Sequence, residues 1–234
     1  MRKVVITSNM LNEAENNLED WIVNMQNLTD TGIIVVDGGS TDGTQEILRK
    51  EKVIVIEDDI IQREGYGPAR NHLRELAKEH FPDAHWNCFF DCDERIDPSD
   101  FHRFHWIKDY LNEHYFDVVA FPRIDWYDYE RIRSANNIRI TPDPQARMTR
   151  LAYPIKYVRM LHEQVVPSRG MYFNIENCPP IHHFNRPAPD KNRKRVGKVC
   201  ASLHMRDSEF GHTYPMHPKE QKYRDLLEKE GLND

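Results

Sequence analysis

The sequence has no long hydrophobic run. None of its apolar stretches approaches the roughly 20 residues that a membrane-spanning helix requires. Residues 1–10 become polar too early for a secretion signal, so they are interpreted as a first strand. No internal repeat or low-complexity segment occurs along the 234 residues. We therefore expect a soluble globular protein that is large enough to bury a real core.

An excess of positive charge and paired cysteines are also missing. The formal net charge is −6, which argues against bulk nucleic-acid binding. The chain has four cysteines and no C-x-x-C pair, so reduced thiols in a cytoplasmic protein are the simplest account. The one concentrated basic segment, residues 186–198, is more simply a solvated loop and helix face than a clamp for phosphate or an anionic acceptor.

Apolar runs and amphipathic segments alternate along the N-terminal part of the chain. Short runs typical of strands occur at residues 3–7, 33–36, 53–56, 86–90 and 116–121. Segments with helical spacing of apolar residues lie between them, at residues 15–28, 45–51, 67–81 and 98–112. This alternation predicts an α/β fold with a mostly parallel sheet, right-handed crossovers and flanking helices.

Polar segments follow several of these predicted strands. They include residues 9–13, a turn with three glycines at residues 37–44, and an acidic segment from Asp91 to Asp97. Ligands of parallel sheets collect at the carboxyl ends of the strands, which is where these segments lie. We therefore expect the functional site there.

Two carboxylates stand close together in the acidic segment. In an extended chain, Asp91 and Asp93 would project from one face and Cys92 from the other. Adjacent carboxylates are costly unless a cation lies between them, and oxygen ligands suit Mg²⁺ or Mn²⁺. The pattern thus predicts a divalent cation site that could in turn hold a diphosphate. A solvated acidic turn or helix cap is the structural alternative.

Other catalytic motifs fit poorly. An EF-hand loop would need glycine where the chain has Ile96. A D-x-D-x-T/V phosphatase would want threonine or valine after the second aspartate, where Glu94 follows. The pair His162-Glu163 lacks the second histidine of a zinc-protease helix. A nucleotidyltransferase would carry a glycine-rich, basic loop after the first strand, and residues 9–17 contain neither feature.

Six motifs in order resemble those of family 2 glycosyltransferases with the GT-A fold. They are Asn12-Glu13, residues 37–44, residues 69–71, residues 91–95, residues 143–147 and His162-Glu163. Each motif is weak alone, but their shared order and spacing carry the resemblance over roughly the first 185 residues. The resemblance implies a Rossmann-like sheet, mostly parallel, with a smaller C-terminal acceptor side.

The resemblance also implies how the chain is divided. Residues 1–122 would form the donor-binding half, and residues 123–185 the acceptor and catalytic half of the same domain. Residues 186–234 match nothing in the family and are expected to be a charged, helical appendage. Within the second half, residues 124–141 predict a hairpin or flap whose aromatic rings either stack on a sugar or pack in a sheet.

The donor implied by the resemblance is a nucleotide-diphospho-sugar, such as a UDP- or GDP-sugar. Asp37 resembles the aspartate that binds the base or ribose, and it could also cap its own turn. Asp91 would lie near the ribose. Further side chains expected at the base pocket or the phosphates are Thr7, Asn9, Glu13, Arg70 and Arg147.

The D-x-D pair of the family implies a bound Mn²⁺ or Mg²⁺. Asp91 and Asp93 occupy this pair, with Asp93 as the more direct ligand. His182 or His183 stands where such enzymes often supply a further ligand from the C-terminal half. The cation would stabilise the charge that develops on the leaving diphosphate.

Inverting sugar transfer needs a carboxylate that takes the proton of the acceptor hydroxyl. Glu163 is the first candidate for this base and Asp143 the second. Either side chain could instead form a salt bridge, with Arg159 or Arg147 as the partner.

The residues do not identify the nucleobase or the sugar of the donor. They do not identify the acceptor either, which could be a glycan, a lipid or a protein. A nucleotidyltransferase-like enzyme and a non-catalytic module that binds a nucleotide-sugar or glycan are the alternatives. The presence of both candidate catalytic bases, Glu163 and Asp143, counts against a non-catalytic binding module.

Overall fold

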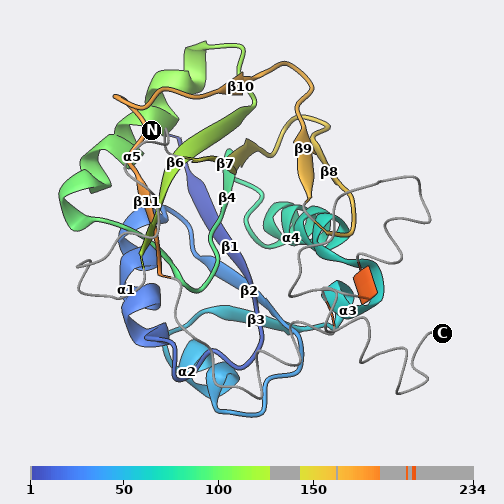
Figure 1. The fold of residues 1–234 in the computed structure, drawn as a ribbon. Coiled ribbons are helices and arrows are strands. Elements are labelled where there is room, and N and C mark those ends of the chain that lie inside the picture. The colour runs from blue at the N-terminus through green and yellow to red at the C-terminus, as the bar shows by residue number, and fades with distance from the viewer. Residues whose placement is uncertain (1, 127–142, 162, 185–198, 200–201, 204–234) are drawn as a thin grey trace.

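The computed structural model describes residues 2–126, 143–161, 163–184, 199 and 202–203 (Figure 1). The strands are β1 (Val4–Met10), β2 (Ile33–Asp37), β3 (Ile54–Glu57), β4 (Trp86–Phe89), β5 (Glu94–Ile96), β6 (Val118–Trp126), β7 (Asp143–Arg150), β8 (Lys156–Val158), β9 (Gln164–Val166), β10 (Met171–Tyr172) and β11 (Ile181–Phe184). The helices are α1 (Leu18–Leu28), α2 (Thr44–Lys50), α3 (Ile60–Glu64), α4 (Tyr66–His80) and α5 (Phe101–Tyr110), with 3₁₀ turns at Pro98–Asp100 and Leu111–Glu113.

A nine-stranded sheet runs through the molecule in the order β3-β2-β1-β4-β7-β6-β11-β5, and β10 pairs with β6. Strands β3, β2, β1 and β4 pair in parallel, which confirms the arrangement predicted from the alternation of strands and helices. Strand β7 lies antiparallel between β4 and β6. Strands β8 and β9 form a separate antiparallel hairpin.

Helices cover both faces of the sheet (Figure 1). Apolar side chains of α1, α2 and α5 pack in one cluster with Val4 and Ile6 of β1. The apolar side of α4 packs on the other face with Val5. Because side chains alternate along a strand, one apolar run such as β1 can serve both clusters. The sheet is therefore held between two helical layers.

Several boundaries differ from the expected ones. Strand β1 continues through Asn9 to Met10, and helix α3 is an addition that the sequence does not predict. Residues 94–96, within the acidic segment, form β5. The expected division at residue 122 falls within β6, so both halves contribute strands to one sheet.

Parts of the sequence-based prediction lie outside the described residues. Residues 124–126 of the expected flap belong to β6, and the rest of the flap is not described. Of the expected helical appendage at 186–234, only residues 199, 202 and 203 are described. Cys88, Cys92 and Cys178 are buried free thiols. Within the described ranges, no helix is both long and apolar enough to cross a membrane.

Candidate active site

A hollow of about 400 Å³ opens at the carboxyl ends of β1, β2 and β4. Asn9 and Met10 border it from β1, Gly38 from the turn after β2, and residues 91–93 from the turn after β4. His183 on β11 closes it from the other side. This is the edge at which a ligand is expected in an open α/β sheet.

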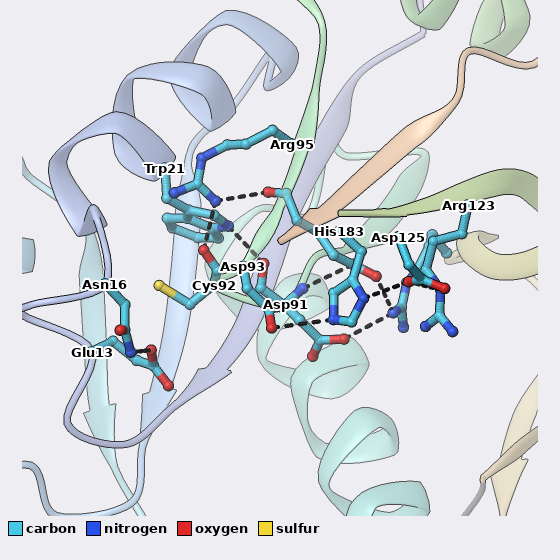
Figure 2. Close-up of polar contacts among 12 residues, drawn as sticks. Glu13, Asn16, Trp21, Asp91, Cys92, Asp93, Arg95, Arg123, Asp125 and His183 are labelled. Carbon is cyan, nitrogen blue, oxygen red and sulfur yellow. Dashed lines mark hydrogen bonds and ion pairs between the residues drawn. The ribbon is translucent and has the colours of Figure 1, made fainter. Parts of the chain in front are cut away.

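The acidic segment after β4 is a turn. The N–H of Glu94 donates to the carbonyl of Asp91 at 3.0 Å. The predicted reason for the placement of Asp91 and Asp93, alternation along an extended strand, is therefore wrong. Both residues nevertheless line the hollow, and so does Cys92 between them (Figure 2). The indole N–H of Trp21 donates to the Asp91 carbonyl at 3.0 Å and ties the turn to α1.

Asp91 is paired with a buried arginine. Arg147, on β7, donates from one terminal nitrogen to Asp91 Oδ2 at 2.8 Å and to Glu94 Oε1 at 2.5 Å. Partial burial acts to raise the pKa of Asp91, but the positive charges of Arg147 and Arg70 and that of His183 outweigh it and hold this pKa below its usual value. Arg147, an expected phosphate contact, thus binds carboxylates in this structure.

Asp93 faces an imidazole. His183 Nε2 lies 3.2 Å from Asp93 Oδ2, and His183 Nδ1 lies 2.7 Å from Asp125 Oδ1 (Figure 2). Burial acts to lower the pKa of His183, but the carboxylates of Asp93, Glu94 and Asp125 raise it to about 9. The ring is therefore positively charged at neutral pH and acts as the counter-ion of Asp93.

The two histidines predicted as metal ligands point to opposite faces of β11. Successive side chains on β11 point to opposite faces, so His183 borders the hollow and His182 does not. The ring of His182 stacks on Trp126 with centroids 5.9 Å apart. Its Nδ1 accepts the indole N–H of Trp126 at 2.8 Å. Of the pair, only His183 is placed to contact a ligand in the hollow.

Glu13 adds a third carboxylate to the hollow (Figure 2). Burial raises the pKa of Glu13 to about 7, with further contributions from the charges of Asp93 and Asp91, although a hydrogen bond from Asn16 acts against them. Asn16 Nδ2 donates to Glu13 Oε2 at 2.6 Å. Carboxylates that repel one another in this way are an environment in which a divalent cation is stabilised.

The donor set fits Mn²⁺ or Mg²⁺ in kind, with carboxylate oxygens from Asp91 and Asp93 and the imidazole of His183 beside them. The side chains are not already arranged around an ion. Among the residues that the structure describes, no group of three or more His, Cys, Asp or Glu could hold a metal ion as placed. Asp91 is turned toward Arg147, and Asp93 toward His183. An ion bound at Asp93 would replace the charged His183 ring as the counter-ion of this carboxylate.

The amide of Asn9 is the clearest sign of a ligand. Its Oδ1 and Nδ2 are buried and have no hydrogen-bond partner among the described residues. Buried polar groups without a partner are rare because each costs free energy. Asn9 is among the residues that border the hollow, although its amide atoms are themselves covered. The hydroxyl of Thr7, likewise without a partner in the described ranges, lies fully buried beneath it on the same strand.

Asp37 organises the turn after β2. It is fully buried and does not line the hollow. Its Oδ1 accepts from the backbone N–H groups of Gly39 and Ser40, at 3.1 and 2.7 Å, and from Gln45 Nε2 at 2.7 Å. Its Oδ2 accepts the Ser40 hydroxyl at 2.5 Å. The turn-capping role is therefore confirmed, and direct contact with a nucleoside stays a prediction.

Glu163, the first candidate base, forms an ion pair with Arg70. This partner differs from both expected alternatives, Arg159 and Arg147. The Arg70 guanidinium lies 4.0 Å above the ring of Phe89, and that of Arg147 lies 5.3 Å from the same ring. The two arginines thus share one aromatic side chain between the hollow and the β8–β9 hairpin.

A glycine allows Arg70 and Glu163 to meet. Gly67, in the first turn of α4, donates its N–H to the carbonyl of Arg159 at 3.1 Å. A Cβ on Gly67 would collide with this carbonyl. The start of α4 can therefore lie directly against residues 158–160, just before Glu163. The side chain of Asp143, the second candidate base, is not among those described.

Curled α/β architecture with a carboxylate-lined hollow at the carboxyl edge of the sheet defines a GT-A glycosyltransferase fold. Residues 5–166 match the sequence profile of glycosyl transferase family 2, and the chain belongs to this family. The match ends at the last residue of β9, short of the extent that the motifs predict. A search among curated proteins gives no match.

Solved structures with the same fold have very different sequences. Residues 1–349 of TarS from S. aureus align with a TM-score of 0.51 and 14% identity, over 94% of this chain and 77% of that one. The mannosyltransferase PcManGT from Pyrobaculum calidifontis, solved with GDP-Man and Mn²⁺, gives 0.52 and 12%, over 94% and 67%. A longer TarS chain gives 0.50 and 15% over 88% of this chain, which spans only 40% of its length. These similarities show the fold.

Asp37→Ala should destabilise the domain by about 3 kcal/mol, because two backbone N–H groups and the Gln45 amide lose a charged acceptor. Urea unfolding measures this change. Asp59→Ala is the matched control, since that aspartate is 60% exposed and pairs only at the surface. Equal stabilities of the two variants would show that Asp37 does not stabilise the fold.

Proposed function

We propose that this domain binds a nucleotide-diphospho-sugar together with Mn²⁺ or Mg²⁺ in the hollow and transfers the sugar, with inversion, to an acceptor hydroxyl. The observation that carries the proposal is the convergence of Glu13, Asp91 and Asp93 on one hollow, beside Asn9, whose amide has no hydrogen-bond partner in the described part of the chain. The amide suits a polar edge of the nucleoside, and the carboxylates suit the cation that a diphosphate requires. The Mn²⁺ and GDP-Man bound to PcManGT support this choice.

Asp93 and Asp91 would hold the cation, with His183 beside them. When bound, the cation would offset the charge that develops on the leaving diphosphate. The ion pair with Arg147 keeps Asp91 ionised, because it holds the pKa of this carboxyl below its usual value despite partial burial. Asp91 is therefore a charged ligand throughout the neutral range.

Glu163 would take the proton of the acceptor hydroxyl. One of its oxygens, Oε1, is bound by Arg70. The other oxygen, Oε2, is not part of this ion pair, and it is the one that would take the proton. The pair with Arg70 also fixes the orientation of the carboxylate, and a general base must be placed within hydrogen-bond distance of its substrate.

The acceptor is a hydroxyl of a glycan, a lipid or a protein, and UDP- and GDP-sugars are the donors to test first. Membership of a glycosyltransferase family favours sugar transfer over nucleotidyl transfer. A non-catalytic binding module would bind the same donor but would not depend on Glu163 for any turnover. The three described free thiols suit a protein of the reducing cytoplasm.

Asp93→Ala should abolish cation-dependent nucleotide binding and leave the domain folded. In the parent protein, UDP or GDP at 100 times its Kd should stabilise the fold by about 2.7 kcal/mol when Mn²⁺ is present. Thermal shifts with and without Mn²⁺ measure this effect. Asp83→Ala, at a 79% exposed position near the other end of the sheet, should behave like the parent. An equal Mn²⁺-dependent thermal shift in Asp93→Ala, or no effect of Mn²⁺ on the parent, would contradict a cation site at Asp93.

Glu163→Gln should retain donor and Mn²⁺ affinity but slow transfer by about 10²-fold or more, since it loses the proton acceptor and can still accept a hydrogen bond from Arg70. Asp143→Asn should be milder. Steady-state rates at saturating donor separate the two. If Glu163→Gln is nearly active and Asp143→Asn is inactive, the base is Asp143 and Glu163 is a structural partner of Arg70.

A further inference from the structure

Glu94 has a completely buried carboxylate next to the acidic turn, and it does not line the hollow. Its Oε1 accepts from Arg147 at 2.5 Å, and its Oε2 accepts the backbone N–H of Asp91 at 3.1 Å. Both oxygens are therefore engaged, one by a side chain from β7 and the other by the main chain of the turn. The side chain of Glu94 links these two elements.

Arg147 lies between two carboxylates of different exposure. Its own side chain is 3% exposed, that of Glu94 is 0% exposed and that of Asp91 is 42% exposed. Burying a guanidinium is costly unless the charge is paired inside the protein. Glu94 supplies that internal charge, and Asp91 is left as the partner that faces the hollow.

Loss of the Glu94 charge would change the position of Asp91. Arg147 would then have Asp91 as its nearest counter-ion, and their attraction is strong where water is excluded. The Asp91 carboxylate would be drawn toward β7 and away from the hollow. Glu94 of β5 also lies opposite His183 of β11 in the backbone register of these two strands. The same residue therefore connects the turn to the strand that carries His183.

We propose that Glu94 is a positioning residue of the donor site. It holds Arg147 and the turn of residues 91–94, so that Asp91 keeps a carboxylate oxygen for a ligand in the hollow. This inference rests on the proposed function, in which that ligand is a divalent cation with a nucleotide diphosphate. Glu94 itself touches neither.

Glu94→Gln tests the proposal because it removes the charge and keeps the shape. The probe is Mn²⁺, followed by the electron paramagnetic resonance signal of the free ion, with UDP present and in parallel with GDP. Partners that orient metal ligands typically contribute about 10- to 100-fold to metal affinity, and we expect a loss of about tenfold here. A folding measurement by circular dichroism accompanies each titration.

Asp30→Asn is the matched control. Asp30 pairs with Lys108, which is fully buried, at 2.6 Å between Nζ and Oδ1, at the opposite end of β1 from the hollow. Breaking this pair should lower the melting temperature and leave Mn²⁺ affinity unchanged. If Glu94→Gln behaves in the same way, its role is structural and the proposal is overturned.

The dependence on Arg147 is tested in a double-mutant cycle. In an Arg147→Gln background, Glu94→Gln should change Mn²⁺ affinity by less than about twofold, because the residue through which it acts is gone. A full tenfold effect in that background would overturn the proposal.

Arg147→Lys keeps the test decisive if Glu94→Gln fails to fold. Lysine retains a buried positive charge but is shorter than arginine, so its ammonium would not reach the position from which one terminal nitrogen of Arg147 binds both carboxylates. Mn²⁺ affinity should therefore again fall about tenfold. Unchanged affinity in this variant would overturn the role of Glu94. Absence of Mn²⁺ binding by the parent protein would instead overturn the proposed function, and the inference with it.

Discussion

The ion pair that joins Arg147 to Asp91 and Glu94 is the constraint on which the site depends. A buried cation at the centre of β7 can be tolerated only with negative charge beside it, and the turn after β4 supplies that charge twice. The turn is thereby attached to the inserted antiparallel strand. Because this strand also pairs with β4 and β6, the acidic turn is held in place relative to the whole sheet.

Charges of opposite sign continue outward from this pair. Arg70 shares the Phe89 ring with Arg147 and binds Glu163. On the other side of the hollow, His183 balances Asp93. The candidate base and the candidate cation site are therefore parts of one electrostatic system. A change in the charge at either end, such as the arrival of a cation or a diphosphate, alters the field at the other.

The parallel half of the sheet could be predicted from the sequence because its signals are local. The apolar run at residues 33–36 and the glycine-rich turn after it mark a buried strand and its end without reference to the rest of the chain. The hollow followed from topology, since carboxyl ends of parallel strands share an edge. The converging positions of Asp91 and Asp93 were thus predicted, although the stated reason, strand alternation, was wrong.

The partners across the sheet could not be predicted. Strand β7 lacks a continuous apolar run because two of its buried residues, Arg147 and Thr149, are polar. Its contacts with Asp91 and Glu94 span more than fifty residues of sequence. The ion pair of Arg70 with Glu163 likewise depends on how α4 meets the β8–β9 hairpin. Glu94 belongs to the motif of residues 91–95, but nothing near it in the sequence indicates that it pairs with Arg147.

In the proposed function, the hollow holds a divalent cation between the acidic turn and a nucleotide diphosphate. Anomalous diffraction at the manganese edge, on crystals grown with Mn²⁺ and UDP or GDP, tests it most directly. We expect a peak within about 2.0–2.6 Å of an oxygen of Asp93, the range over which hard divalent cations bind oxygen, with the diphosphate on its other side. A nucleotide bound in the hollow with no anomalous peak at Asp93, or a peak elsewhere, would contradict it.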